Sequence, residues 1–218
     1  MCISMSRRHL IAISAAAVTT PHLSWAQNTD AIRSLHGALD IDSFKGKKGA
    51  RLKASQQAVF SIGGDAFLTN SALEADIEIA EDGLVQKLTI LSGEALAVLK
   101  PRTSRQTALL LPNSTASIRG TGFYVNIGIE EPKNYICCCY GHIQFEDNSD
   151  GTPQQLKNSY HNAVTIDETG RFGTPSMNFP FGHYDDELVM LENQVGRAPH
   201  WQLPDNKMHF LSSKPLPL

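Results

Sequence analysis

Apolar and polar positions in the middle of the chain follow the two-residue period of β-strands. Residues 73–79 alternate Leu, Ala, Ile and Ile with Glu, Asp and Glu, which predicts a strand with one buried face and one acidic face. Residues 95–99 and 108–111 are continuously apolar, as is typical of strands covered on both faces. Similar segments recur as far as residue 166. The pattern predicts a mostly β fold, either a sandwich or a solenoid-like domain of short strands.

Three segments at the edges of this pattern are harder to interpret. Residues 31–42 fit a helix or a strand, although Gly37 argues against a helix interior. Residues 43–55 carry five basic side chains and two glycines, which we interpret as a solvated loop. The pair Ser92-Gly93 is interpreted as a break between two strands.

A single helix is predicted near the C-terminus, over residues 184–195. Three acidic residues stand at its start, where the helix dipole favours negative charge, and Gly196 follows it as a C-cap. Its apolar positions form one stripe at helical spacing: Tyr184, Leu188, Leu191 and Val195. We expect this stripe to pack on a β domain formed by residues 27–180. Residues 181–218 would comprise the helix and an extended, proline-rich tail.

The first 26 residues have the organisation of a signal peptide. Arg7 and Arg8 precede an uncharged, apolar stretch over 10–20, and Ser24-Trp25-Ala26 supplies small residues at a cleavage site. The paired arginines indicate a twin-arginine signal, with a general secretory signal as the alternative. We expect a mature N-terminus at Gln27 and a periplasmic or secreted protein. No later apolar run is long enough to cross a bilayer, so no stable membrane span is expected after cleavage.

The charge of the mature chain excludes one class of partner. Residues 27–218 hold 17 Lys and Arg against 22 Asp and Glu, a formal charge of −5. Nucleic-acid binding needs clustered basic residues, so we expect no nucleic-acid partner.

Known catalytic motifs are missing from the sequence. It contains no serine nucleophile elbow, no Walker loop and no His-Glu-x-x-His. The glycine-rich residues 119–122 are followed by a strand pattern and not by a helix, so they do not fit a phosphate cradle. A nucleophilic pair of Cys137 or Cys139 with His142 or His161 is conceivable. Three adjacent thiols resemble ligands or redox partners more than one tuned nucleophile, and we predict that the protein is not an enzyme.

Cysteine usage is unusual for an exported protein. Cys2 leaves with the signal peptide, and the other three are consecutive: Cys137, Cys138 and Cys139. An odd, clustered set is not a disulfide framework. On a strand, Cys137 and Cys139 point to one face and Cys138 to the other.

Two thiolates on one face can share a soft metal ion if further ligands complete the set. The candidates are His161 and His183, whereas His142 lies on the opposite face. The sequence therefore predicts a metal site of Cys137, Cys139, His161 and His183 for zinc, copper or iron. A thiol redox pair, or cysteines that act only as small core residues, are the alternatives.

Four segments in a fixed order carry a resemblance to the FecR-like domain family: residues 92–98, 115–125, 135–141 and 183–197. The second contains Ile-Arg-Gly-Thr-Gly-Phe-Tyr-Val, which is similar to the family's core strand, and the third reads Tyr-Ile-Cys-Cys-Cys-Tyr-Gly. The resemblance implies an all-β domain, with a strand at 31–41. It also implies a non-catalytic binding, signalling or scaffolding function, with a periplasmic protein or small ligand as partner. Well-known members regulate sigma factors through a cytoplasmic segment, which has no counterpart before the apolar stretch of this sequence.

Overall fold

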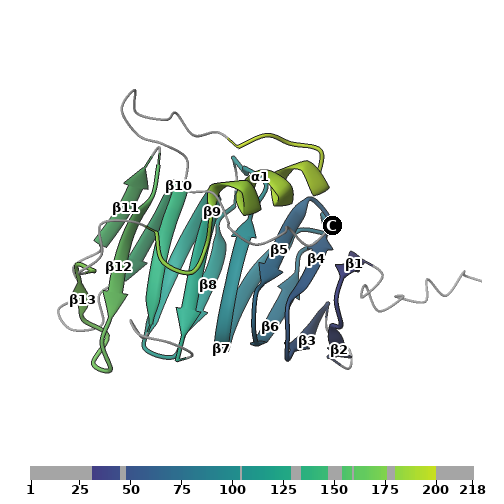
Figure 1. The fold of residues 1–218 in the computed structure, drawn as a ribbon, viewed down its shortest axis with the longest axis horizontal. Coiled ribbons are helices and arrows are strands. Elements are labelled where there is room, and N and C mark those ends of the chain that lie inside the picture. Colours follow the sequence, from purple (N-terminus) through teal and green to yellow (C-terminus); the bar gives the residue numbers. More distant parts are fainter. Residues whose placement is uncertain are drawn as a thin grey trace, which may run out of the picture.

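A computed structural model describes residues 31–44, 48–103, 105–128, 134–146, 154–158, 160–175 and 180–199 (Figure 1). These residues form thirteen strands and one helix. The strands are β1 Ile32–His36, β2 Asp40–Ser43, β3 Gly49–Ala54, β4 Ala58–Ile62, β5 Asp65–Thr69, β6 Leu73–Ile79, β7 Val85–Val98, β8 Thr107–Leu111, β9 Ser114–Ile127, β10 Tyr135–Glu146, β11 Gln154–Asn158, β12 Asn162–Ile166 and β13 Phe172–Gly173, and the helix is α1 Asp185–Gln194. The predicted mostly β fold with one C-terminal helix is confirmed.

All the strands join one mixed sheet. The path through it runs β1-β4-β5-β7-β8-β9-β10-β12-β13, with β6, β3 and β2 leading off from β7 and β11 pairing with β10. Neighbouring strands are antiparallel except for β7 and β8, which run parallel.

The sheet bends because its longest strands change partners halfway. The first part of β7 pairs with β6 and β8, and the part from Gly93 onward pairs with β9 and β5. Gly93 has φ 95°, a backbone conformation that side chains disfavour, and an added Cβ would collide with the Ala72 carbonyl. The predicted break at Ser92-Gly93 is therefore wrong: glycine bends a continuous strand there.

The two halves of the bent sheet enclose the main core, which makes the arrangement sandwich-like. Leu52 and Ile77 from one half, and Phe60 and Phe123 from the other, belong to the same buried cluster. The rings of Phe60 and Phe67 stack with centroids 5.0 Å apart. Each fully buried side chain of this size contributes about 2 kcal/mol through removal of apolar surface from water.

A second, smaller cluster covers the outer face of the sheet. Helix α1 lies across this face, where Leu188 and Leu191 pack with Leu68, Leu96 and Tyr124 (Figure 1). Leu188 and Leu191 are fully buried, whereas Tyr184 at the helix start is 38% exposed. The predicted apolar stripe is therefore deepest at its centre.

The segment 43–55 corrects one expectation. It contains β3, which lies between β2 and β6, and not only a solvated loop. Ala50 and Leu52 are buried, while Arg51 and Lys53 point outward and pair with acidic residues of β6. The apolar residues of this segment alternate with Arg51 and Lys53, and these basic side chains led us to interpret a strand as a loop. Residues 31–42, whose sequence fitted either a helix or a strand, contain β1 and most of β2, with Gly37 between the two strands.

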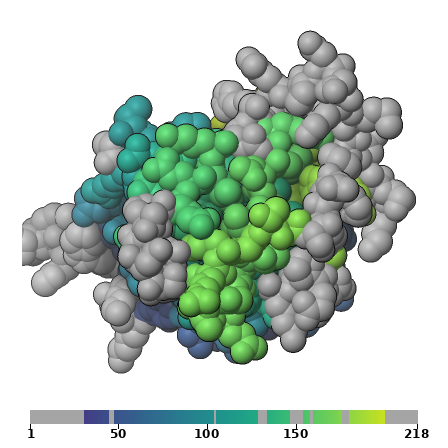
Figure 2. Space-filling model, turned by 90° about the vertical axis from the view of Figure 1, so that its left-hand side faces the viewer, coloured from purple at the N-terminus to yellow at the C-terminus, as the bar shows by residue number. Residues whose placement is uncertain are grey.

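Several sequence expectations lie outside the described residues: the signal peptide over 1–26, the cleavage site before Gln27 and the tail from residue 200. The division at residue 180 stays a prediction. Within the described ranges, no helix combines the length and apolar character needed to cross a bilayer. Figure 2 shows the end of the sheet that is formed by the later strands. Residues coloured green make up much of the described surface in this view.

Two substitutions on α1, one at a buried and one at an exposed position, test how the helix packs. Leu191→Asp places a charge without a partner in the apolar cluster and should lower the free energy of unfolding by about 3 kcal/mol or more. Val189 lies on the same helix but is 37% exposed, so Val189→Asp should change stability far less. Urea denaturation measures both. Equal stability of the two variants would contradict the assignment of the buried face.

Candidate metal centre

Strand β10 delivers two thiols to the outer face of the sheet, beneath the segment that leads into α1. Cys137 and Cys139 belong to the outer cluster, and Cys138 belongs to the main core. The alternation predicted from the strand period is confirmed. Cys139 sits at a register shift between Cys138 and Tyr140, so the pairing with β9 is locally interrupted there.

His161 reaches the thiols from the segment before β12. Its backbone N–H donates to the carbonyl oxygen of Cys139 at 2.9 Å, which fixes the residue beside β10. Its φ is 40°, in the left-handed region that non-glycine residues rarely occupy. In this conformation its Nδ1 lies 3.5 Å from Sγ of Cys137.

His183 reaches the same place from the chain just before α1. Its ring stacks on Tyr124 with centroids 4.6 Å apart and planes 17° apart. Gly182 has φ 74°, and an added Cβ would collide with the Tyr124 ring, so this close approach requires glycine. The Nε2 atom of His183 lies 3.3 Å from Sγ of Cys139.

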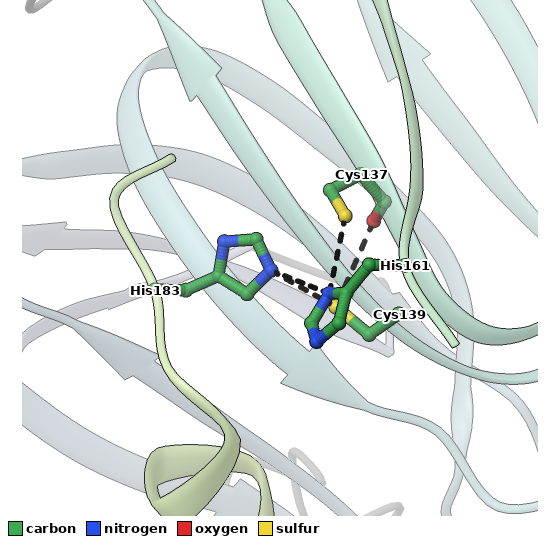
Figure 3. A group of neighbouring side chains, drawn as sticks. All are labelled: Cys137, Cys139, His161 and His183. Carbon is green, nitrogen blue, oxygen red and sulfur yellow. Dashed lines mark hydrogen bonds between the residues drawn. The ribbon is translucent and has the colours of Figure 1, made fainter. Parts of the chain in front are cut away.

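The four residues predicted as metal ligands thus meet at one point (Figure 3). One donor atom from each of them lies within 4.8 Å of all the others. Cys137, Cys139 and His183 are at most 1% exposed, and the His161 side chain is 6% exposed. His142 is not a member of this group. Its predicted place on the opposite face is wrong, because β10 shifts register on either side of Tyr140 and the next residue, Ile143, belongs to the main core together with Cys138.

The outward nitrogen of each imidazole has its own hydrogen-bond partner. His161 Nε2 lies 2.8 Å from Oδ1 of Asp185, and His183 Nδ1 lies 2.8 Å from the Phe181 carbonyl oxygen. A proton on each outward nitrogen would leave lone pairs on the inward ones. These inward nitrogens, His161 Nδ1 and His183 Nε2, are only 3.3 Å apart. Two facing lone pairs at this distance repel unless a proton or a metal ion lies between them.

Asp185 is the functional residue that sequence reasoning missed. Its position at a helix start suggested only a favourable interaction with the helix dipole. In the structure it is 1% exposed, and its other oxygen accepts a hydrogen bond from the Tyr160 hydroxyl at 2.7 Å. The short spacing His183-Tyr-Asp185 was the available signal, because it places a carboxylate beside a proposed ligand.

The buried groups shift one another's protonation. Burial opposes ionisation of Cys137, but the hydrogen bond from Cys139 and the nearby imidazoles outweigh it and lower the pKa of Cys137 well below its usual value. Burial and the adjacent Cys137 raise the pKa of Cys139 well above normal. Burial lowers the pKa of His161, yet its bonds to Asp185 and Cys137 prevail and raise it to about 9. Without metal, the site therefore favours a Cys137 thiolate beside a charged His161.

The spacing of the donor atoms matches a small tetrahedral site. With zinc–nitrogen bonds of about 2.0–2.1 Å and zinc–sulfur bonds of about 2.3 Å, a tetrahedron places nitrogens about 3.3 Å apart and nitrogen about 3.6 Å from sulfur. The observed nitrogen–nitrogen distance is 3.3 Å, two of the four nitrogen–sulfur distances are 3.3 and 3.5 Å, and all the donor atoms lie within 4.8 Å of one another. Little movement would bring these atoms into zinc coordination.

Cys137, His161 and Asp185 also stand in the order thiol, imidazole, carboxylate that cysteine nucleophiles use. Such a nucleophile must meet a substrate, and Cys137 is 1% exposed beneath the segment that leads to α1. Burial favours a ligand role over a catalytic one.

The bond from Asp185 to His161 gives a test in metal-free protein. Asp185→Asn should lower the pKa of His161 from about 9 toward the ordinary 6.5, because the amide cannot stabilise the charged ring. A raised pKa means that this contact stabilises the fold fully below about pH 6.5 and loses its effect as the pH rises through about 9. NMR titration measures the pKa. Asp186→Asn, next along the helix, is the control, and an equal shift in both variants would contradict the assignment.

Comparisons with known proteins give little that is specific. No protein-family model matches the sequence, and no curated protein matches it. Among solved structures, the chain is similar to the crystal structure of a proposed anti-sigma factor from Parabacteroides distasonis, with 10% sequence identity and a TM-score of 0.41. The match covers 65% of this chain and 58% of the other, so the chain spans little more than half the length of that structure.

Proposed function

We propose that this protein is a non-catalytic β domain that binds one zinc ion through Cys137, Cys139, His161 and His183. The single observation that carries the proposal is the arrangement of the two inward imidazole nitrogens, which face each other at 3.3 Å with a thiol beside each. Their outward nitrogens are held by Asp185 and by a carbonyl, the arrangement found around metal-bound histidines. A proton on one inward nitrogen also relieves this repulsion, but a divalent metal with two thiolates satisfies all four donors at once.

The donor set favours zinc over the other metals considered. Two sulfur and two nitrogen ligands in a closed tetrahedron are typical of structural zinc. Copper(I) prefers a softer set dominated by thiolates or thioethers, and catalytic iron sites keep open positions. The burial of the four donors supports a closed, structural site.

A metal here would join three separate parts of the chain. Cys137 and Cys139 lie on β10, His161 precedes β12, and His183 precedes α1. Each of these segments loses conformational freedom on folding, and a shared ion offsets part of that cost. We therefore assign the metal a structural function, fastening the start of α1 to the sheet.

Within this proposal the domain is an exported, periplasmic or secreted FecR-like binding, signalling or scaffolding module. Support comes from the signal-peptide pattern of residues 1–26 and from the motif of residues 115–125, all of which lies in β9. A twin-arginine signal suits a metal protein, because that route carries folded proteins and the metal can enter where thiols stay reduced. Its partner would be a periplasmic protein or a small ligand.

The metal proposal is tested by the metal content of the purified protein. Wild-type protein should contain close to one zinc per chain, and Cys137→Ala with Cys139→Ala should abolish it. Cys138→Ala is the matched control, since Cys138 is buried in the main core on the other face of the same strand. Elemental analysis by mass spectrometry measures the content.

A chelator provides the second readout. Removal of zinc should lower the thermal midpoint of the wild type and of Cys138→Ala, because a ligand that binds only the folded state stabilises it. The double variant should not respond. A fully stable wild type that holds no metal after metal-replete expression would refute the proposal.

Export is tested separately. The secreted protein should begin at Gln27, and Arg7→Lys with Arg8→Lys should retain the precursor in the cytoplasm if the signal is of the twin-arginine type. Mass spectrometry of periplasmic and cytoplasmic fractions measures both. Recovery of the periplasmic protein with its first 26 residues intact would contradict the signal-peptide prediction, and unchanged export of the lysine variant would exclude the twin-arginine route.

A further inference from the structure

Away from the cysteines, the segment between β7 and β8 forms a pocket of about 390 Å³ with three arginines in its wall. Its described lining residues are Arg102, Thr103, Arg105, Gln106 and Arg119. None of these lining residues is acidic, although the whole chain has a net charge of −3. Such a concentration of guanidinium groups in an acidic protein favours an anionic ligand.

Arg102 is the buried arginine among the lining residues. Its side chain is 8% exposed, and its Nη2 pairs with Asp65 at 3.2 Å. Asp65 is itself fully buried and accepts the backbone N–H groups of Val85 at 2.9 Å and Lys100 at 2.8 Å. These contacts fix the direction of the guanidinium group.

The other two nitrogens of Arg102 have no hydrogen-bond partner among the described residues. Its Nε and Nη1 atoms are shielded from solvent and make no hydrogen bond within the described part of the chain. Leaving a buried charged donor unsatisfied is costly, since its hydration is lost without replacement. A bound oxyanion that entered the pocket, with a small shift of the wall, would supply the acceptors.

Arg119 lines the pocket from strand β9. With the Gln106 amide turned so that its oxygen faces Arg119, that oxygen accepts from the guanidinium and the amide nitrogen donates to Oγ of Ser117 at 3.1 Å. Arg105, another lining residue, is exposed. The pocket thus combines the buried guanidinium group of Arg102 with two exposed ones. Of these two, the group of Arg119 is held in place by Gln106.

We propose that this pocket binds a phosphate group, with Arg102, Arg105 and Arg119 as its cationic ligands. Planar guanidinium groups donate paired hydrogen bonds to phosphate oxygens, and three of them match the charge and the several acceptors of one phosphate. A neighbouring hollow of about 490 Å³ shares Arg102 and Arg105 but also includes Glu81 and Asp82. Repulsion from these carboxylates restricts the phosphate to the side that contains Arg119.

The test measures binding of inorganic phosphate to the full mature protein by equilibrium dialysis. Arg105→Gln with Arg119→Gln should weaken binding by about tenfold or more, because two charge-assisted contacts are lost. The control is Arg33→Gln with Arg171→Gln, which removes the same charge from two exposed arginines elsewhere and should leave binding unchanged. No saturable binding, or equal weakening in both double variants, overturns the proposal for free phosphate.

A second arm identifies the source of the phosphate group. Vesicles of phosphatidylglycerol are compared with neutral phosphatidylcholine vesicles in a co-sedimentation assay. Loss of anionic-vesicle binding in Arg105→Gln with Arg119→Gln, but not in the control, would assign the phosphate to a lipid headgroup. Failure of both arms overturns the site.

Arg102 needs a conservative variant because it also neutralises Asp65. Arg102→Lys keeps that charge but removes the planar fork, so it should weaken phosphate binding while the thermal midpoint stays near that of the wild type. Unchanged phosphate affinity in this variant would exclude Arg102 from the site.

Discussion

The central constraint in this structure is a buried cluster of two thiols and two imidazoles. Because the cluster is shielded from solvent, the protons and lone pairs of these four groups must find hydrogen-bond or metal partners among themselves and their protein neighbours. The pleat of β10 sends Cys137 and Cys139 to the same face, and the chain before α1 returns to cover them with His183. The outward nitrogens are already committed to Asp185 and to the Phe181 carbonyl oxygen. What lies between the inward atoms must therefore be positive: a proton in metal-free protein, or the metal ion that we propose.

A second polar layer surrounds this centre and explains why the helix carries so many buried acids. Glu187 accepts from the Asn70 amide at 3.0 Å and from the Tyr184 backbone N–H at 2.9 Å. Glu192 accepts from the Tyr140 hydroxyl and from Arg197, at 2.6 Å for the latter. Burying carboxylates without such partners would cost several kcal/mol each. The helix is thus held by directed polar contacts as well as by its apolar stripe, which fixes its rotation and hence the position of Asp185.

Local sequence patterns predicted those features that depend on a two-residue or helical period. The opposite faces of Cys137 and Cys138 and the helix from Asp185 follow from such periods, and both are confirmed. Strand β3 was missed because its basic residues suggested a loop, although its apolar residues alternated with them. The bond between Asp185 and His161 could not be predicted, because it depends on the three-dimensional return of a loop with an unusual backbone conformation. The convergence of His161 and His183 was predicted from chemistry alone, without a register to support it.

X-ray absorption at the zinc edge of the purified protein tests the central claim most directly. The account predicts two sulfur neighbours at about 2.3 Å and two imidazole nitrogens at about 2.0–2.1 Å around each zinc ion. A first shell made only of oxygen and nitrogen would place the metal elsewhere on the protein. That result, or protein that binds no zinc while its three buried thiols remain reduced, would contradict the account.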